Sequence, residues 1–193
     1  MLAKLQDSLK KSIAAKEAFA KDQGKNIITL VEKIIATMHE GGKLLIFGNG
    51  GSAADAQHMA AEFINRFLIN RAPLPAIALT TDTSVITSIS NDFSYDDIFV
   101  KQIQALGKKG DLALGISTSG NSPNVVKAVE TAMDMGIYTA VLTGGTGGIL
   151  IDKADLCLNV PTSFTPNIQE SHIWAIHLIC QLVEEAIFGG DRA

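Results

Sequence analysis

Short apolar runs alternate with stretches of helical spacing along most of the chain. The runs suit strands that are buried on both faces of a sheet, and they occur at residues 44–47, 75–79, 111–116, 138–142 and 156–160. Helical spacing follows the first run and returns over residues 84–90, 124–135 and 166–188. Strands and helices that alternate in this way predict an α/β fold with a parallel sheet covered on both faces. In such folds the ligand binds at the carboxyl ends of the strands.

The first forty residues lack a strand pattern and show helical spacing twice, over residues 2–13 and again over residues 27–38. Asp22-Gln23-Gly24 lies between the two segments, so the pattern predicts two helices or one helix with a break. The second segment is apolar over more than half of its circumference, which exceeds what one sheet face covers. We therefore expect part of it to pack against another subunit.

Length and composition favour one domain over two. At 193 residues the chain can form one substantial core, and no stretch has the composition of an interdomain linker. We expect a single domain over residues 1–193, made of N-terminal helices at 1–40, a sheet core at 43–160 and a C-terminal helix at 166–188.

Charge and cysteine content exclude several classes of partner. The formal net charge is -4 and the Lys and Arg residues are scattered, so we expect neither nucleic acid nor a membrane as a partner. No apolar stretch approaches the ~20 residues of a membrane span, and the charged N-terminus does not resemble a signal peptide, which indicates the cytoplasm. Cys157 and Cys180 lie in apolar contexts and are expected to be free thiols.

The first apolar run ends in Gly48-Asn49-Gly50-Gly51, which lets the backbone turn tightly. We expect Ser52 to be the N-cap of the next helix, with Asp55 as the acidic partner of a capping box. A helix N-terminus presents free amides and a positive dipole end, so the loop is predicted to bind an anion such as a sugar phosphate. No nucleotide is expected, because the loop is neither a P-loop nor a dinucleotide fingerprint.

Titratable side chains lie on two of the predicted helices. His58 and Glu62 are four residues apart and share a face, so they either point at the ligand of the glycine-rich loop or form a solvated ion pair. The last helix carries a second group, and its periodicity pairs Gln169 with His172, or Glu170 with His177. Spacing alone does not choose between the two histidines.

A second polar loop, Ser117 to Pro123, follows the third apolar run. Ser122 is typical of an N-cap and Pro123 of a first helical residue. Hydroxyls and free amides at a helix N-terminus form a neutral phosphate cradle, although the pattern also fits an ordinary polar turn. We interpret the glycine run at residues 144–148 as a connector, because only a short turn follows it.

Five motifs in this order resemble the sugar isomerase (SIS) domain family, and most closely its phosphoheptose isomerase branch: GNGGS, H-x-x-x-E, SNDF, ISTSGNS and IQE-x-H-x-x-x-x-H. The resemblance spans nearly the whole chain. It implies a flavodoxin-like three-layer sandwich with a five-stranded parallel sheet, whose N-terminal and C-terminal helices pack a homotetramer. It also implies an aldose–ketose isomerase that converts sedoheptulose 7-phosphate to D-glycero-D-manno-heptose 7-phosphate, the first step toward activated heptose.

Residue by residue, the resemblance implies Glu62 as the general base and His177 as the general acid. The implied phosphate ligands are Ser52, Ser117, Thr118, Ser119 and Ser122. The implied sugar contacts, besides Glu62, are Asn49, Gly50, Gly51, Asn91, Asp92 and Gln169. Some members of the family bind zinc, so one zinc ion per subunit is expected at the matching residues His58, Glu62, Gln169 and His177. His172 is expected to be structural or interfacial.

A carboxylate and an imidazole on opposite sides of a sugar suit aldose–ketose isomerisation. The base removes a proton next to the carbonyl, and the acid or a metal stabilises the enediolate. A different class within the same branch is a non-enzymatic regulator that binds the bacterial replication initiator. In that class the positions of Glu62 and His177 lack the acid and base, whereas this chain has both. The sequence therefore favours the enzyme.

Overall fold

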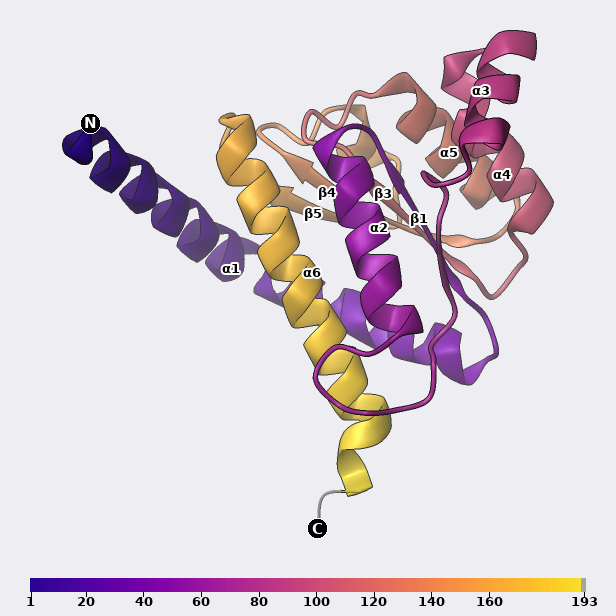
Figure 1. Ribbon diagram of the computed structural model, residues 1–193, viewed down its shortest axis with the longest axis horizontal. Coiled ribbons are helices and arrows are strands. Elements are labelled where there is room, and N and C mark those ends of the chain that lie inside the picture. Colours follow the sequence, from indigo (N-terminus) through magenta and orange to yellow (C-terminus); the bar gives the residue numbers. More distant parts are fainter. Residues whose placement is uncertain (192–193) are drawn as a thin grey trace.

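The computed structural model describes residues 1–191, in which strands and helices alternate along the chain (Figure 1). The helices are α1 (Leu2–His39), α2 (Gly51–Ile64), α3 (Thr83–Asp92), α4 (Ile98–Leu106), α5 (Pro123–Asp134) and α6 (Thr165–Phe188). The strands are β1 (Leu44–Gly48), β2 (Ala76–Ala78), β3 (Leu112–Ile116), β4 (Tyr138–Gly144) and β5 (Leu156–Val160).

The strands form one parallel sheet in the order β2-β1-β3-β4-β5. Leu44 of β1 lies opposite Ala76 of β2 on one side and opposite Leu112 of β3 on the other. The chain passes from β1 to β2 in one direction and then returns to β3 in the other, so β1 and β3 flank a topological switch point. The predicted α/β class and the five-stranded parallel sheet are confirmed.

Alternate residues of each strand face opposite layers of helices, because side chains alternate along a strand. Leu44 and Ile46 pack with α1, α2 and α6, whereas Leu45 and Phe47 pack with α4 and α5. Every position of β1 is buried, which explains its unbroken apolar run. The result is the expected three-layer sandwich (Figure 1).

The helix α1 is continuous, so both predicted forms of this segment, two helices or one with a break, are wrong. Gly24 costs about 1 kcal/mol of helix propensity relative to alanine, but packing on both sides of it outweighs that cost. Before it, Phe19 is fully buried and its ring centroid lies 6.1 Å from that of Trp174 on α6. After it, Ile27 is buried. Tertiary contacts thus hold the helix together through its weakest segment.

The apolar surface of α1 over residues 27–38 is covered mostly within the subunit, by α6 and β5. Leu30 and Ile34 are fully buried and Ile28 is exposed, so only a small part of this segment is left for the subunit contact that the sequence predicts. The N-terminal half of α1 instead projects from the sandwich (Figure 1). It leaves a row of apolar side chains exposed at helical spacing: Leu2, Leu5, Leu9 and Ile13.

The helix α2 begins earlier than expected. Its N-cap is Gly50, with a φ of 56°, and the N–H of Ser52 donates to the Asn49 carbonyl at 3.0 Å. The predicted N-cap role of Ser52 and its capping box with Asp55 are therefore wrong. The positive φ of Gly50 closes the turn before the chain reaches Ser52. Residues with a Cβ rarely adopt that conformation, so this early turn depends on glycine.

Residues 83–106 contain more helix than the sequence predicts. The helix α3 extends to Asp92, and Asp82 caps it by accepting a hydrogen bond from the Val85 N–H at 3.0 Å. The helix α4 is missing from the predicted elements. The sequence feature that could have predicted this helix is the spacing of Ile98, Phe99 and Ile103, which are buried and lie on one helical face. The strands differ little from their predicted bounds: β2 is shorter than predicted, and β4 extends to Gly144.

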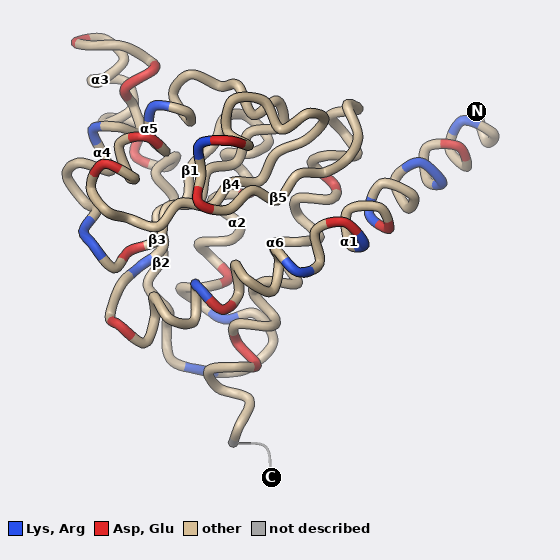
Figure 2. The backbone as a smooth tube through the Cα atoms, turned by 180° about the vertical axis from the view of Figure 1, so that it is seen from behind, with Lys and Arg blue, Asp and Glu red and all other residues tan. Residues whose placement is uncertain are grey.

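Charged residues form no stripe of one sign in the described part of the chain, where Lys and Arg are interspersed with Asp and Glu (Figure 2). The buried Asp111 is paired: its Oδ2 lies 2.6 Å from Lys43 Nζ, and it accepts hydrogen bonds from the backbone N–H groups of Lys43 and Lys108. This pair precedes β1 and β3, at the edge of the sheet opposite their carboxyl ends. Within residues 1–191, none of the helices combines the length and apolar character that crossing a membrane requires.

Candidate active site

The loops after β1 and β3 meet at the switch point between these strands. Asn49, the first residue after β1, pairs with the buried Asn124 of α5: each Nδ2 donates to the other's Oδ1, at 2.8 and 2.9 Å. The Tyr95 hydroxyl donates to Asn49 Oδ1 at 3.0 Å. These contacts hold the Asn49 amide in one orientation and leave one of its two N–H groups for a ligand.

The first loop approaches the second one closely beside Ser52. A Cβ on Gly48 would stand 2.9 Å from Ser52 Cβ and 2.7 Å from the carbonyl oxygen of Ile116, the last residue of β3. The glycine therefore lets the two loops come together. Ser52 lies in the first turn of α2 and is 4% exposed, next to the point where the Ser117 loop begins.

Side chains from α2 and α6 meet at the other side of the first loop. His58 Nε2 lies 3.3 Å from Glu62 Oε1 and 3.0 Å from His177 Nε2. The pair on α2 is thus not isolated on a solvated face, because a side chain from a distant part of the sequence joins it. Of the two histidines of α6 that periodicity does not separate, His177 is the one that faces α2.

A cavity of about 390 Å³ opens beside this group, and its lining includes Gly51, Asp55, His58 and Gln169. Gln169 lies so close to Gly51 that a Cβ on that residue would clash with the Gln169 amide. Asp55 Oδ2 is buried and has no hydrogen-bond partner within the described residues. Burial raises the pKa of Asp55 to about 6, against the opposing effect of His58. The cavity therefore holds polar groups that are available to a ligand.

The loop between β3 and α5 holds the candidate phosphate site. Ser122 is the N-cap of α5 and Pro123 is its first residue, as predicted. The hydroxyls of Ser117 and Ser122 are 3.0 Å apart, and Ser119 Oγ accepts a hydrogen bond from the Asn121 N–H at 3.2 Å. A second cavity, of about 340 Å³, borders this loop. Its lining is uncharged and includes Thr118, Ser119, Gly144, Thr146, Ser163 and Thr165.

The glycine run at 144–148 supports the serine loop from the side. Gly120 has a φ of 65°, and a Cβ there would clash with the carbonyl of Gly147. The N–H of Leu150 donates to the Gly120 carbonyl at 3.1 Å, and the N–H of Ile149 donates to Asn121 Oδ1 at 2.9 Å. The run is a connector, in agreement with its interpretation from the sequence, and it also fixes the shape of the serine loop.

Several residues of the second cavity are absent from the sequence-based site. Thr146 follows β4, whereas Ser163 and Thr165 follow β5, and all three face the same space as Ser119. The signal that could have found them is their position, since polar residues just beyond parallel strands gather at one edge of the sheet.

Asn91 and Asp92 are the candidate residues that the fold leaves apart from the others. Both are exposed at the end of α3, and Asn91 Nδ2 donates to Asp92 Oδ1 at 2.8 Å. Within residues 1–191, no hydrogen bond or ion pair joins either of them to another candidate residue. Tyr95 is the residue of this segment that reaches Asn49.

Comparison with known proteins identifies the family. The profile of the SIS domain matches residues 9–144, which is more than half of the chain. The chain belongs to the SIS domain family. The wider comparison also places it in the phosphoheptose isomerase branch of that family, as the sequence motifs indicate.

Relatives at about 40–50% identity over most of the chain include phosphoheptose isomerases. That of Roseiflexus sp. (strain RS-1) is 50% identical over 182 residues, which cover 94% of this chain and 92% of that protein. That of Aneurinibacillus thermoaerophilus is 49% identical and covers 95% of this chain and 94% of its own length. The structure of phosphoheptose isomerase GmhA from Neisseria gonorrhoeae matches with a TM-score of 0.91 and 41% identity, over 95% of this chain and 98% of that one.

The residues that the SIS resemblance implies as zinc ligands have suitable donor atoms, but they are not arranged to hold the ion. His58, Glu62 and His177 supply the nitrogen and oxygen donors that zinc prefers. Among residues 1–191, however, no group of three or more His, Cys, Asp or Glu side chains is arranged to hold a metal ion. The 3.0 Å between the two Nε2 atoms is shorter than the ~3.3 Å between two nitrogens on one tetrahedral zinc ion. This distance suits a hydrogen bond between the two imidazoles.

His172 is a structural histidine of the SIS core, one of the two roles expected for it. It is fully buried, and its Nε2 donates to the Thr143 carbonyl at 2.9 Å. Burial lowers the pKa of His172 from 6.5 to about 4, although the hydrogen bond with Thr143 opposes this. The imidazole is therefore neutral in the folded protein at neutral pH.

Acid is expected to destabilise the folded protein through His172. Between pH 6.5 and about 4 the imidazole is protonated in the unfolded chain but not in the folded one, so the free energy of unfolding decreases as the pH falls through this window. Over the whole window the free energy of unfolding decreases by about 3 kcal/mol. Urea titrations at pH 7 and pH 4.5 should show a smaller decrease in His172→Gln than in the unmodified protein. Equal decreases would contradict the assignment.

Proposed function

We propose that this SIS protein is a phosphoheptose isomerase, which interconverts sedoheptulose 7-phosphate and D-glycero-D-manno-heptose 7-phosphate and so begins the synthesis of activated heptose. The observation that carries the proposal is an identity of about 50%, over more than nine tenths of each chain, to proteins of that name. The convergence of Glu62, His58 and His177 beside a ligand-sized cavity supports it. Conversion of sedoheptulose 7-phosphate by the purified protein tests it directly.

The reaction moves a proton between neighbouring carbons of the sugar through an enediolate. In the proposed mechanism Glu62, whose side chain is 24% exposed, removes the proton, and His177 donates one to the developing oxyanion. The two residues come from different helices and can flank the sugar. The proposed sugar contacts in the same cavity region are the free N–H of Asn49, the backbone of Gly50 and Gly51, and Gln169. Asn91 and Asp92 stay predictions, since neither contacts this group.

The phosphate of the substrate is proposed to bind the hydroxyls and free amides at the start of α5, without a basic side chain. The uncharged cavity and the N-cap position of Ser122 support this, because a helix N-terminus attracts anions. The proposed ligands are Ser52, Ser117, Thr118, Ser119 and Ser122.

Ser119→Ala is expected to raise the KM for sedoheptulose 7-phosphate roughly tenfold or more. Ser119 is exposed at the cavity, and one hydrogen bond to a charged group is worth about 1.5–3 kcal/mol. Initial rates over a range of substrate concentrations measure the change. An unchanged KM would mean that the phosphate binds elsewhere.

Zinc is proposed as a cofactor, one ion per subunit, held by His58, Glu62, Gln169 and His177. Support comes from the donor types alone, since the present distance between His58 and His177 suits a hydrogen bond. When bound, the metal would polarise the oxygens of the substrate. Metal analysis of protein purified without chelators tests the proposal, and a zinc content near zero in active protein would reject it.

A homotetramer in the cytoplasm is proposed, in which the N-terminal and C-terminal helices pack the subunits. The exposed apolar row on the projecting half of α1 supports the assembly, and the free thiols of Cys157 and Cys180 suit a reducing compartment. Light scattering at micromolar concentration should give four times 20.5 kDa. A monomeric mass would contradict the assembly.

The alternative function, a regulator that binds the replication initiator, is not supported by these comparisons. The relatives at about 50% identity are named as isomerases, and the proposed acid and base are both present. A protein without turnover that binds the initiator would reverse this conclusion.

A further inference from the structure

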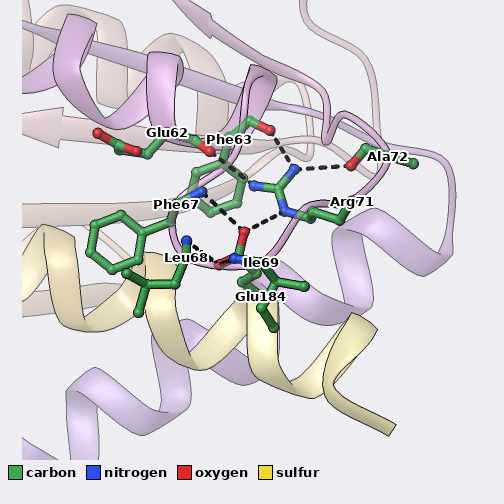
Figure 3. Close-up of polar contacts among 8 residues, drawn as sticks. All are labelled: Glu62, Phe63, Phe67, Leu68, Ile69, Arg71, Ala72 and Glu184. Carbon is green, nitrogen blue, oxygen red and sulfur yellow. Dashed lines mark hydrogen bonds and ion pairs between the residues drawn. The ribbon is translucent and has the colours of Figure 1, made fainter. Parts of the chain in front are cut away.

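A buried ion pair joins the loop after α2 to the last helix, next to the end of α2 that carries Glu62 (Figure 3). Arg71 and Glu184 are 3% and 1% exposed, and Arg71 Nε lies 2.9 Å from Glu184 Oε1. The same carboxylate accepts hydrogen bonds from three consecutive N–H groups of the loop: Phe67 at 3.0 Å, Leu68 at 2.6 Å and Ile69 at 2.9 Å. One side chain of α6 thus fixes the backbone of a whole turn.

The other side of the Arg71 guanidinium holds the end of α2 (Figure 3). Its Nη2 donates to the carbonyl of Glu62 and its Nη1 to that of Phe63, both at 2.9 Å. The last carbonyls of a helix have no partner within the helix, so a guanidinium here replaces the missing hydrogen bonds. The backbone that carries the proposed base is therefore anchored by Arg71.

The loop also reaches the proposed acid. The ring of Phe67 stacks on the imidazole of His177, with centroids 5.6 Å apart and planes at 26°. His177 and Glu184 are seven residues apart on α6 and share a face, so the helix that presents the acid also holds the loop that covers it.

We propose that the Arg71–Glu184 pair is a positioning element for the isomerisation, which fixes Glu62 and His177 relative to each other. This inference rests on the proposed function. The pair contacts the backbone of Glu62 directly and acts on His177 through Phe67.

Stability alone is a weak reason for such a pair. Two buried charges cost desolvation energy, and well-packed apolar residues often stabilise a core as well or better. An apolar pair would not, however, organise three N–H groups and two helix carbonyls at once. Burial by itself would raise the pKa of Glu184, but the hydrogen bonds from Leu68, Phe67, Ile69 and Arg71 outweigh it and lower the pKa, so the carboxylate is charged at neutral pH.

The test compares Glu184→Gln and Phe67→Leu with Asp111→Asn. Glutamine replaces one acceptor oxygen of Glu184 by an NH₂ group that faces N–H donors, which releases the loop. Asp111 is the matched control, because it is also a buried carboxylate that binds a basic side chain and backbone N–H groups, but it lies just before β3 and its partners are Lys43 and Lys108, not α2 or the loop after it. Unfolding in urea, kcat, KM and the ¹³C NMR signal of the His177 imidazole are measured for each protein.

Glu184→Gln should lower kcat by about tenfold or more, with a KM within about threefold of normal, because a small misplacement of catalytic groups is costly. Phe67→Leu should also lower kcat. Both variants should shift the His177 signal, Phe67→Leu because it removes the stacked ring and Glu184→Gln because the released loop carries the ring away. Asp111→Asn should lose stability while it keeps its kcat and its His177 signal.

Unchanged kcat and an unchanged His177 signal in both site variants would overturn the proposal and leave the pair a purely structural one. If Glu184→Gln does not fold, the kcat of Phe67→Leu decides whether the loop that the pair holds acts on His177, and an unchanged kcat overturns the proposal. If the unmodified protein has no turnover, the proposed function fails, and the NMR signal alone then decides whether the pair positions His177.

Discussion

Glu62→Gln is expected to lower the turnover of sedoheptulose 7-phosphate by at least ~100-fold, the lower range for general acid–base catalysis. Glutamine keeps the shape and can still bond with His58, which lies 3.3 Å from Glu62 Oε1, but it cannot take a proton from carbon. Substrate binding should survive, because the proposed phosphate site lies in a separate cavity.

The measurement is kcat together with the zinc content of each preparation. If zinc binds Glu62, the variant loses metal as well as the base, and only samples of equal metal content separate the two causes. Near-normal turnover with the metal intact would remove Glu62 from the mechanism.

His177→Gln is expected to have an effect of similar size, at least ~100-fold on turnover, because it removes the proposed acid opposite the base. The amide of glutamine can replace the hydrogen bond to His58 Nε2, so the helices α2 and α6 should stay together. Steady-state kinetics at neutral pH measure the loss.

His172→Gln is the matched control, since it changes the other histidine of the same helix. Its side chain bonds to the Thr143 carbonyl in the core, and turnover should remain within a few-fold of normal. Equal losses in the two variants would mean that neither acts specifically as the acid.

The contrast between these histidines shows where sequence reasoning reaches its limit. His172 and His177 lie on a helix that is packed on much of its surface, so hydrophobic spacing does not show which of them faces the sheet and which faces α2. That choice depends on how α6 docks. The strands were predictable because burial on both faces makes them apolar throughout, as in β1.

The helix starts show a second limit. The sequence predicts the cap of α5, where Ser122 and Pro123 form a local signature. It misses the cap of α2, because glycine at position 50 permits a backbone conformation that no side-chain pattern records. The contact between Arg71 and Glu184 spans 113 residues and has no local signature at all.

The place of α6 in the chain has a consequence for synthesis. It follows all five strands of the sheet, and its residues pack on α1 and α2 in one core. Chains grow on the ribosome at about 5–20 residues per second. Until α6 has been synthesised, the apolar side chains of α1 and α2 that pack on it stay exposed to water. The growing chain is most exposed to aggregation in this interval, and it gains the proposed acid, the Gln169 amide and the Glu184 carboxylate together when α6 docks.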